Sequence, residues 1–357
     1  MKRLMTPLCV TLVVAGFSVL AQSQARDIAF DSNPSPLMLP DDIYLGEVGG
    51  VAANSKGDIY VYTRTGHPTI SIGASRAFAH GGSRLFQFDR TGKFVRELGR
   101  DSYGMLVAQQ VRIDPQDNVW IVDLMAGYVN KLDVAGRPIL LLGRKPESVN
   151  VPANAGPGGG GEGGGGGRGR GGLPGAGAES DVFNRPTDVA WDSAGNIFVA
   201  DGLGNARVAK FDSKGVFIKS WGSRGSEPGM FANVTAIAVD AQGNVYAADA
   251  GNRRIQVFDN NGTFKMAIAN VGMPSALCMT PPPNQVLYVS NSNPPEDFDN
   301  GGEIYKVKLD GTIVGRFGRV GKRPKEFGTV NSLDCRTENT LLVGELANMR
   351  VQKLTLH

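Results

Sequence analysis

The chain has 357 residues, and its 37 Lys and Arg against 34 Asp and Glu give a formal net charge of only +3. This near balance excludes nucleic acid or an anionic membrane surface as the obvious partner. Forty-nine glycines and 20 prolines favour turns over long helices, while three cysteines and three histidines exclude a disulfide-rich scaffold and a histidine-rich metal centre.

The N-terminus, residues 1–25, has the pattern of a cleaved secretory signal peptide. Lys2 and Arg3 precede an apolar stretch at 8–20, and small residues follow at the expected cleavage spacing. We therefore expect a mature chain that begins near Arg26 and is exported to the periplasm or the extracellular space. No second apolar run follows, so we expect no membrane span.

The rest of the chain repeats one design. Each unit has a tight turn containing Gly or Asn, then a strand rich in Val, Ile and aromatic residues, then a second hairpin. Four short strands per unit of about 40 to 45 residues are typical of a β-propeller. We predict an all-β, six-bladed propeller over residues 26–357. Equivalent strand ends lie at Thr63, Asp123, Asp201, Asp249, Asn291 and Glu345.

The last unit stops at His357 after three strands. We predict that Leu37 to Leu45 supplies the missing outer strand and closes the ring, which would remove open sheet edges. Two insertions lengthen the repeat. One contains His67 and His80, and the other is a glycine-rich tract at 152–178 that we expect to be a flexible surface loop.

Two residue sets in the repeats have a structural interpretation. Asp123, Asp201 and Asp249 end strands, and we expect them to cap the following turns by accepting backbone hydrogen bonds. Cys278 and Cys335 fall on inner strands of neighbouring blades. We expect free buried thiols there, because such strands can exceed the roughly 7 Å Cα separation that a disulfide tolerates.

Three segments carry a family resemblance: Arg185-Pro-Thr-Asp-Val-Ala, Ala200-Asp-Gly-Leu-Gly-Asn-Ala-Arg-Val and Arg253-Arg-Ile-Gln-Val-Phe. They resemble NHL-repeat six-bladed propellers and, within that group, the peptidyl-α-hydroxyglycine α-amidating lyases (peptidylamidoglycolate lyases). The resemblance extends over nearly the whole mature chain. It implies an exported propeller with a zinc site on the central axis that cleaves a carbinolamide to an amide and glyoxylate.

The resemblance also implies a set of site residues, which this chain has largely lost. The three zinc histidines correspond to Gln109, Thr235 and Asn331, and neutral oxygens are poor zinc ligands. The catalytic tyrosine corresponds to Leu203, and a carboxylate that helps to hold calcium corresponds to Ser332. We expect no catalytic residue and no zinc, while a structural calcium stays open.

Two of the site residues that the resemblance implies, an arginine and a histidine, are present in this chain. Arg64 matches the family's active-site arginine, and His67 falls on a family histidine, so the pocket would keep its anion-binding side. The predicted ligand-binding set is therefore Arg64, His67, Gln109, Thr235 and Asn331. The alternatives are a solvated loop arginine and a chance histidine pair, since His67 and His80 have no evident third metal ligand.

Three function classes compete. We favour a non-catalytic, monomeric binding module that holds a peptide, a small organic acid or a protein at the channel mouth, without nucleic acid. The first alternative is a lyase-like enzyme. The second is a metal-dependent, lactonase-like hydrolase, for which Asp188, Asn331 and Asn233 are the available ligands.

Overall fold

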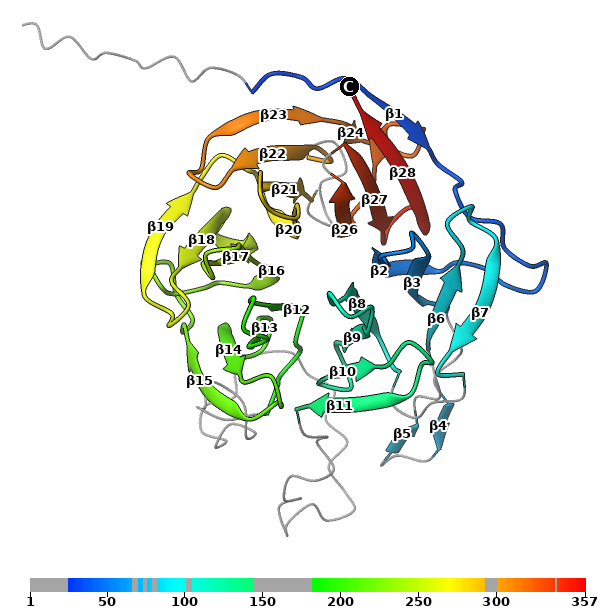
Figure 1. Cartoon of the computed structure of the whole chain (residues 1–357), viewed down its shortest axis with the longest axis horizontal. Helices are drawn as coiled ribbons and strands as arrows, with labels where there is room; N and C mark the ends of the chain where they lie inside the picture. The colour runs from blue at the N-terminus through cyan, green and yellow to red at the C-terminus, as the bar shows by residue number, and fades with distance from the viewer. Residues whose placement is uncertain are drawn as a thin grey trace, which may run out of the picture.

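Six four-stranded antiparallel sheets surround a central axis in the computed structural model (Figure 1). The predicted six-bladed, all-β propeller is confirmed. The predicted signal peptide apart from Ala25, the histidines His67 and His80, and the tract at 152–178 all lie outside the described residues. The structure describes residues 25–65, 70–72, 76–78, 82–100, 105–143, 182–292, 301–337 and 339–357. No helix in these ranges is long and apolar enough to cross a membrane.

We number the blades in chain order and name each blade's strands from the axis outward. Blade 1 contains β2 (Glu47–Ala53), β3 (Ile59–Arg64), β6 (Ser83–Phe88) and β7 (Phe94–Leu98). Blade 2 contains β8 (Ala108–Ile113), β9 (Val119–Asp123), β10 (Tyr128–Leu132) and β11 (Pro138–Leu142). Blade 3 contains β12 (Asp188–Trp191), β13 (Ile197–Asp201), β14 (Arg207–Phe211) and β15 (Phe217–Trp221).

The second half of the ring repeats this order. Blade 4 contains β16 (Val234–Val239), β17 (Val245–Asp249), β18 (Arg254–Phe258) and β19 (Phe264–Ile268). Blade 5 contains β20 (Pro274–Met279), β21 (Val286–Asn291), β22 (Ile304–Lys308) and β23 (Ile313–Phe317). Blade 6 contains β26 (Val330–Thr337), β27 (Thr340–Glu345), β28 (Arg350–Leu356) and β1 (Phe30–Asn33). The minor elements are β4 (Ile70–Ile72), β5 (Arg76–Phe78), β24 (Arg319–Val320), β25 (Glu326–Phe327) and a 3₁₀ turn at Ala250–Asn252.

Aspartates shape the turns between the first and second strands. In blade 3 the Asp192 carboxylate accepts hydrogen bonds from the backbone N–H groups of Ala194 and Asn196, at 3.0 and 2.9 Å. Gly195 completes this turn with a φ of +84°, which glycine adopts without steric cost. Asp114 and Asp240 make the same bonds in blades 2 and 4, which explains the repeated turn signature in the sequence.

Carboxylates at the ends of the second strands anchor the loops between blades. Asp201 accepts a hydrogen bond from the Asn184 N–H at 2.8 Å and pairs with the Arg207 Nε at 2.9 Å. Asp249 and Glu345 repeat this pattern with Arg254 and Arg350. In blade 2, Asp123 accepts from four backbone N–H groups, and burial raises its pKa to about 6. The predicted capping of the following turn by backbone hydrogen bonds is confirmed for Asp123, whereas Asp201 and Asp249 accept their backbone hydrogen bonds from the loops before β12 and β16.

The hydrophobic core is divided among the junctions between blades. Six apolar clusters occur in the described residues, and each joins the facing sides of two neighbouring blades. At the junction of blades 1 and 2, for example, Tyr62 and Leu85 lie in one cluster with Val111 and Ile121. Every blade therefore depends on both neighbours to bury its two faces.

An N-terminal strand closes the ring, as predicted, but the predicted segment was wrong. β1 pairs antiparallel with β28, with Phe30 opposite Leu356, and completes blade 6. Leu37 to Leu45 instead crosses to blade 1, where Met38 donates a backbone hydrogen bond to Gly92 O at 2.7 Å and Leu37 and Leu39 join the core. The chain needs this stretch to travel from the rim to the axis before β2 begins.

The expectation of free thiols was also wrong. Cys278 on β20 and Cys335 on β26 form a disulfide with a Cα–Cα distance of 6.0 Å. Inner strands of adjacent blades converge toward the axis, which brings these Cα atoms within the range that a disulfide bridges. The bond joins blades 5 and 6 covalently.

The two faces of the ring differ in their connections. We call the end where the inner strands begin the start face and the opposite end the turn face. Alternate strands run in opposite directions, so the longest connections between blade strands all lie on the start face, at 34–46, 65–82, 143–187, 222–233, 292–303 and 318–329. Variable loops of this kind are where propellers and other scaffolds place binding functions.

Removing β1 should open the ring. A chain that starts at residue 35 would leave the outer edge of β28 unpaired and would lose the contact of Phe30 with Phe317, whose rings lie 5.2 Å apart. We expect aggregation or loss of cooperative unfolding relative to a chain that starts at Arg26, measured by light scattering and thermal denaturation. An equally stable monomer would contradict closure by β1.

Candidate ligand-binding site on the axis

A ring of equivalent residues surrounds the axis near the start face. Each occupies the equivalent position at the start of the innermost strand of its blade, as the pairing with the second strand shows, and three of the predicted site residues belong to this ring. The ring consists of Gly49, Gln109, Thr187, Thr235, Ser275 and Asn331. The neighbours of these side chains show whether they are available to a ligand or a metal.

Thr235 is used to join blades. Its hydroxyl donates a hydrogen bond to the carbonyl of Pro274 in blade 5, at 2.8 Å. Thr187 does the same toward Val234 in blade 4, also at 2.8 Å. The ring position is therefore a repeated inter-blade contact, and Thr235 is one copy of it.

Asn331 and Gln109 lie together on the other side of the ring. The Asn331 amide donates hydrogen bonds to the carbonyls of Gly49 and Gln109, at 2.6 and 2.8 Å. The Gln109 side-chain oxygen accepts a hydrogen bond from Arg64 Nη2 at 3.2 Å. The structure thus brings Arg64, Gln109 and Asn331 together, whereas the contacts of Thr235 are with blades 4 and 5.

Arg64 is held in a fixed orientation at the end of β3. Its Nε donates to the Ala108 carbonyl at 2.9 Å, and its Nη1 pairs with Glu47 Oε2 at 2.8 Å. The Arg64 side chain is 23% exposed and that of Glu47 is 45% exposed. The Arg64 guanidinium therefore lies at the start face in a fixed orientation. Its ion-pair partner is the carboxylate of Glu47, from the same blade.

The donor set does not fit the zinc that the family resemblance implies. Gln109, Thr235 and Asn331 offer neutral oxygens and nitrogens, and the Asn331 amide and the Thr235 hydroxyl donate their protons to backbone carbonyls. Ser332, the calcium position, donates to Gln110 Oε1 at 2.7 Å and accepts from the Val51 N–H at 3.0 Å. Across the described ranges, no cluster of three or more His, Cys, Asp or Glu is placed to hold a metal ion.

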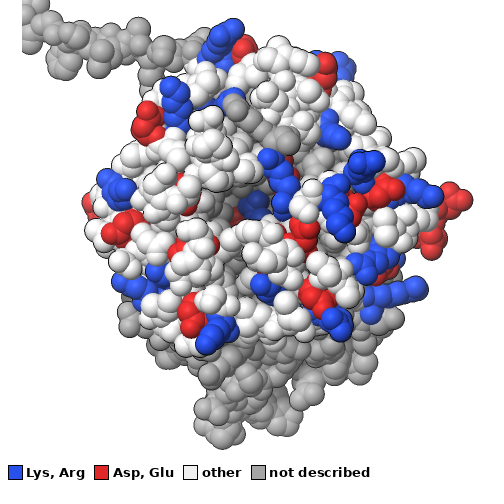
Figure 2. Space-filling model, in the orientation of Figure 1, with Lys and Arg blue, Asp and Glu red and all other residues white. Residues whose placement is uncertain are grey.

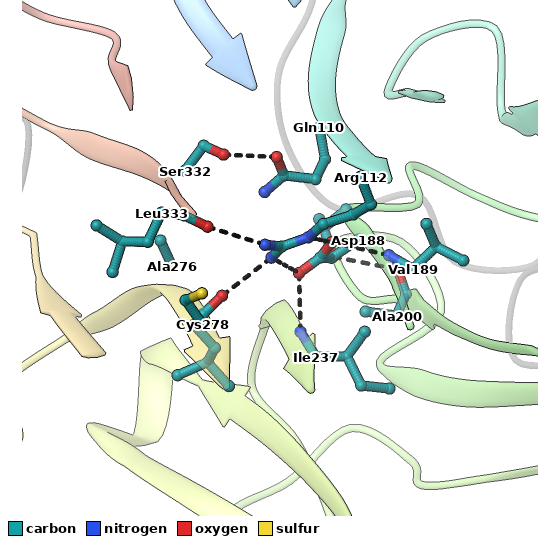
Figure 3. A network of polar contacts seen from close by, with 12 residues as sticks. Gln110, Arg112, Asp188, Val189, Ala200, Ile237, Ala276, Cys278, Ser332 and Leu333 are labelled. Carbon is teal, nitrogen blue, oxygen red and sulfur yellow. Dashed lines mark hydrogen bonds and ion pairs between the residues drawn. The ribbon is translucent and has the colours of Figure 1, made fainter. Parts of the chain in front are cut away.

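A buried ion pair lies deeper on the axis (Figure 3). Arg112 Nε and Nη2 bind both carboxylate oxygens of Asp188, at 2.9 and 2.7 Å. The same guanidinium donates to the carbonyls of Leu333 and Leu277, each at 3.0 Å. Asp188 also accepts from the Ile237 N–H at 3.0 Å. Blades 2 to 6 therefore meet in one polar network.

The charges of this pair are mutually compensated. Burial alone would lower the pKa of Arg112, but the charge and hydrogen bonds of Asp188 raise it above its ordinary value. The Asp188 carboxylate is completely buried, and its oxygens are occupied by Arg112 and by backbone N–H groups. Asp188 is thus committed to a guanidinium and does not fit a lactonase-like divalent ion site.

Sequence reasoning missed Arg112. Pairing with the second strands aligns it with Ala52, Ala190 and Ala238 in blades 1, 3 and 4. A long cation at a position that carries alanine in three other blades was the available signal, because an unpaired charge would not be tolerated there. Its partners, Asp188 and two backbone carbonyls from blades 5 and 6, could not be identified before the ring was assembled.

The surface around the axis has no single dominant charge in the view of Figure 2. Lys and Arg alternate with Asp and Glu over the blades, and a hollow with charged groups lies at the centre of this face. Such interspersed charge agrees with the small formal net charge of +3. Any recognition at the axis therefore depends on particular side chains more than on a long-range field.

Breaking the Arg112–Asp188 pair should destabilise the fold. Arg112→Met or Asp188→Asn would each strand a buried partner, so we expect each to lower the free energy of unfolding by about 3 to 5 kcal/mol. The double variant should cost less than the sum of the two, as measured by urea denaturation. Arg137→Met, at an arginine that is 81% exposed, is the control and should change stability by less than about 0.5 kcal/mol. If the single variants lower the free energy of unfolding as little as Arg137→Met does, the central role of the Arg112–Asp188 pair is refuted.

Comparison with known proteins agrees with this fold. A family profile described as a six-bladed β-propeller matches residues 179–306. Peptidyl-glycine alpha-amidating monooxygenase A of Xenopus laevis is 27% identical over 324 residues, which cover 85% of this chain but only 31% of that protein. The chain thus spans about a third of that relative. A probable peptidyl-alpha-hydroxyglycine alpha-amidating lyase of Caenorhabditis elegans is 28% identical over 48% of this chain and 43% of its own.

Among solved structures, a gluconolactonase from Xanthomonas campestris superimposes with a TM-score of 0.55. It shares 14% sequence identity, and the match covers 88% of this chain and 87% of that one. At this identity the likeness concerns the fold alone. Taken with the sequence relatives, these findings show that the chain is a six-bladed β-propeller that resembles the peptidyl-α-hydroxyglycine α-amidating lyases.

Proposed function

We propose that this protein is an exported binding propeller that holds a carboxylate-bearing ligand, such as a peptide C-terminus or a small organic acid, on the start face. One observation carries the proposal. The positions that hold zinc in the amidating lyases are used here for hydrogen bonds between blades, through Thr235 and Asn331. The lyase scaffold is kept, while the side chains at its metal position stabilise the ring.

Arg64 supports the choice of ligand class. A guanidinium presents five N–H donors, and the described protein groups accept from three of its nitrogens once each. Its fixed orientation lowers the entropic cost of gripping a carboxylate. The Asn331 and Gln109 side chains next to it supply a neutral polar surface for the rest of the ligand.

Glu47 gives this site a specific property. Its carboxylate bonds to Arg64 and is almost half exposed, so an incoming carboxylate competes with it for the guanidinium. Displacing a partly exposed partner costs little, since such pairs contribute about 0 to 1 kcal/mol. Competition from Glu47 thus lowers the affinity of Arg64 for a carboxylate alone. It favours ligands that make further contacts besides the one with Arg64.

Export is supported by the N-terminal pattern and by the Cys278–Cys335 disulfide. Disulfides persist in oxidising compartments and are rare in the cytosol. In this proposal the protein works in the periplasm or outside the cell, as a monomer.

A lyase-like enzyme is the second candidate, favoured by Arg64 at the family's active-site arginine and by the relatives named above. Metal analysis and an activity assay separate the two. We expect far less than one equivalent of zinc in the purified protein and no glyoxylate from a peptide that ends in α-hydroxyglycine, with or without added Zn²⁺. Stoichiometric zinc together with glyoxylate release would establish the lyase and reject the binding module.

Arg64 and Glu47 variants test the carboxylate site. The probe is a peptide with a free C-terminal glycine carboxylate, compared by calorimetry with the same peptide as an amide. Arg64→Ala should weaken binding of the acid by about 2 kcal/mol or more, Arg64→Lys by less, and Glu47→Gln should strengthen it.

Arg84 provides the matched control, because it pairs with Glu97 in the same blade and is also 23% exposed. Arg84→Ala should leave the Kd unchanged. Equal binding of acid and amide, or equal Kd values for wild type, Arg64→Ala and Glu47→Gln, would place the ligand elsewhere.

A further inference from the structure

The axis has a second opening, on the turn face. A cavity of about 330 Å³ is formed by the ends of the inner strands of blades 2 to 6. Arg112 contributes to its wall, so the Arg112–Asp188 pair separates this cavity from the ring of Gln109 and Asn331 near the start face. We call this cavity the turn-face pocket.

The walls of the turn-face pocket are mainly apolar. Trp191 and Val239 line it on blades 3 and 4, and Met279 and Pro281 line it on blade 5. Trp191 is fixed by stacking on Trp120, with ring centroids 5.6 Å apart. A small, largely apolar cavity with a few polar groups is the usual form of a small-molecule site, and 330 Å³ is at the lower end of that class.

Arg336 is the polar group in this wall with unused hydrogen-bonding capacity. Its Nη2 donates to the Ile113 carbonyl at 3.2 Å, and its buried Nε has no acceptor within the described part of the chain. Arg112, in contrast, uses Nε, Nη1 and Nη2 in four hydrogen bonds. A guanidinium at the edge of an apolar cavity with few acceptors favours a ligand that brings an anionic oxygen.

Asp334 is the carboxylate in the pocket wall, and it is already engaged. Its two oxygens accept from the backbone N–H groups of Ala53 and Arg336, at 3.1 and 3.4 Å. The lining therefore carries two cations, Arg112 and Arg336, and this one anion. Arg112 is neutralised by Asp188. Burial raises the pKa of Asp334, and the charge of nearby Arg336 opposes that rise, so the lining has no excess positive charge. A ligand carboxylate is favoured here by the unused hydrogen-bonding capacity of Arg336.

We propose that the turn-face pocket binds a small organic acid with an apolar body, placing its carboxylate on Arg336 and its hydrocarbon part against Trp191 and Met279. This site is separate from the carboxylate site at Arg64 and goes beyond the proposed function. Ligands larger than the pocket, such as folded proteins, reach only its rim.

The test uses 3-phenylpropionate and its uncharged amide as probes of the full mature chain. Binding is followed by tryptophan fluorescence and by calorimetry. We expect saturable binding with about tenfold preference for the acid, and Arg336→Gln should remove about tenfold of affinity, as expected for a hydrogen bond to a charged group. Trp191→Phe should reduce the fluorescence change while calorimetric binding persists.

Two further variants keep the proposal falsifiable. Ala190→Leu narrows the cavity without changing a charge and should abolish binding, with near-ultraviolet circular dichroism to verify the fold. Arg64→Ala should have no effect, which separates this site from the one on the start face. The proposal is overturned if the acid shows no saturable binding, if acid and amide bind equally, or if folded Arg336→Gln and Ala190→Leu proteins bind like wild type.

Discussion

One guanidinium organises the axis of this propeller. Six innermost strands converge there, and their backbone groups must find partners in a space too narrow for another strand. Arg112 provides such partners, because its guanidinium binds Asp188 and the carbonyls of Leu277 and Leu333. Ser332 likewise bonds to Gln110 and to Val51 of blade 1. A buried ion pair contributes little net stability against an apolar replacement, so its main effect is to fix how the blades are placed around the axis.

This constraint is met by hydrogen bonds at the positions that the family resemblance assigns to zinc ligands. A metal at the axis would tie blades together through its ligands. In this chain Thr235 and Asn331 make equivalent ties as ordinary hydrogen bonds, and the Cys278–Cys335 disulfide adds a covalent one between blades 5 and 6. These positions are structurally important through their hydrogen bonds, and a binding function beside them would use neighbouring groups such as Arg64.

Sequence reasoning predicted the features that repeat within each blade. It missed the contacts that form between blades when the ring closes. The turn aspartates, the strand ends at Asp201 and Asp249, and six blades followed from short patterns. The closing strand was displaced because Leu37 to Leu45 and Phe30–Asn33 are both short, β-compatible segments, and only pairing with β28 distinguishes them. The disulfide was missed because sequence spacing does not give the convergence of inner strands, which brings two Cα atoms to 6.0 Å.

Predictions about the site divided in the same way. The structure brings Arg64, Gln109 and Asn331 together, as their positions within the repeats implied, and their role in binding a ligand stays a prediction. No other blade has an arginine at the position of Arg112, and the structural role of Arg112 depends on carbonyl groups that are far away in the sequence. Its guanidinium bonds across the axis to blades 3, 5 and 6 and lies between the start-face ring and the turn-face pocket. The propeller can therefore carry two recognition sites on one axis, coupled only through the rigidity of the inner strands.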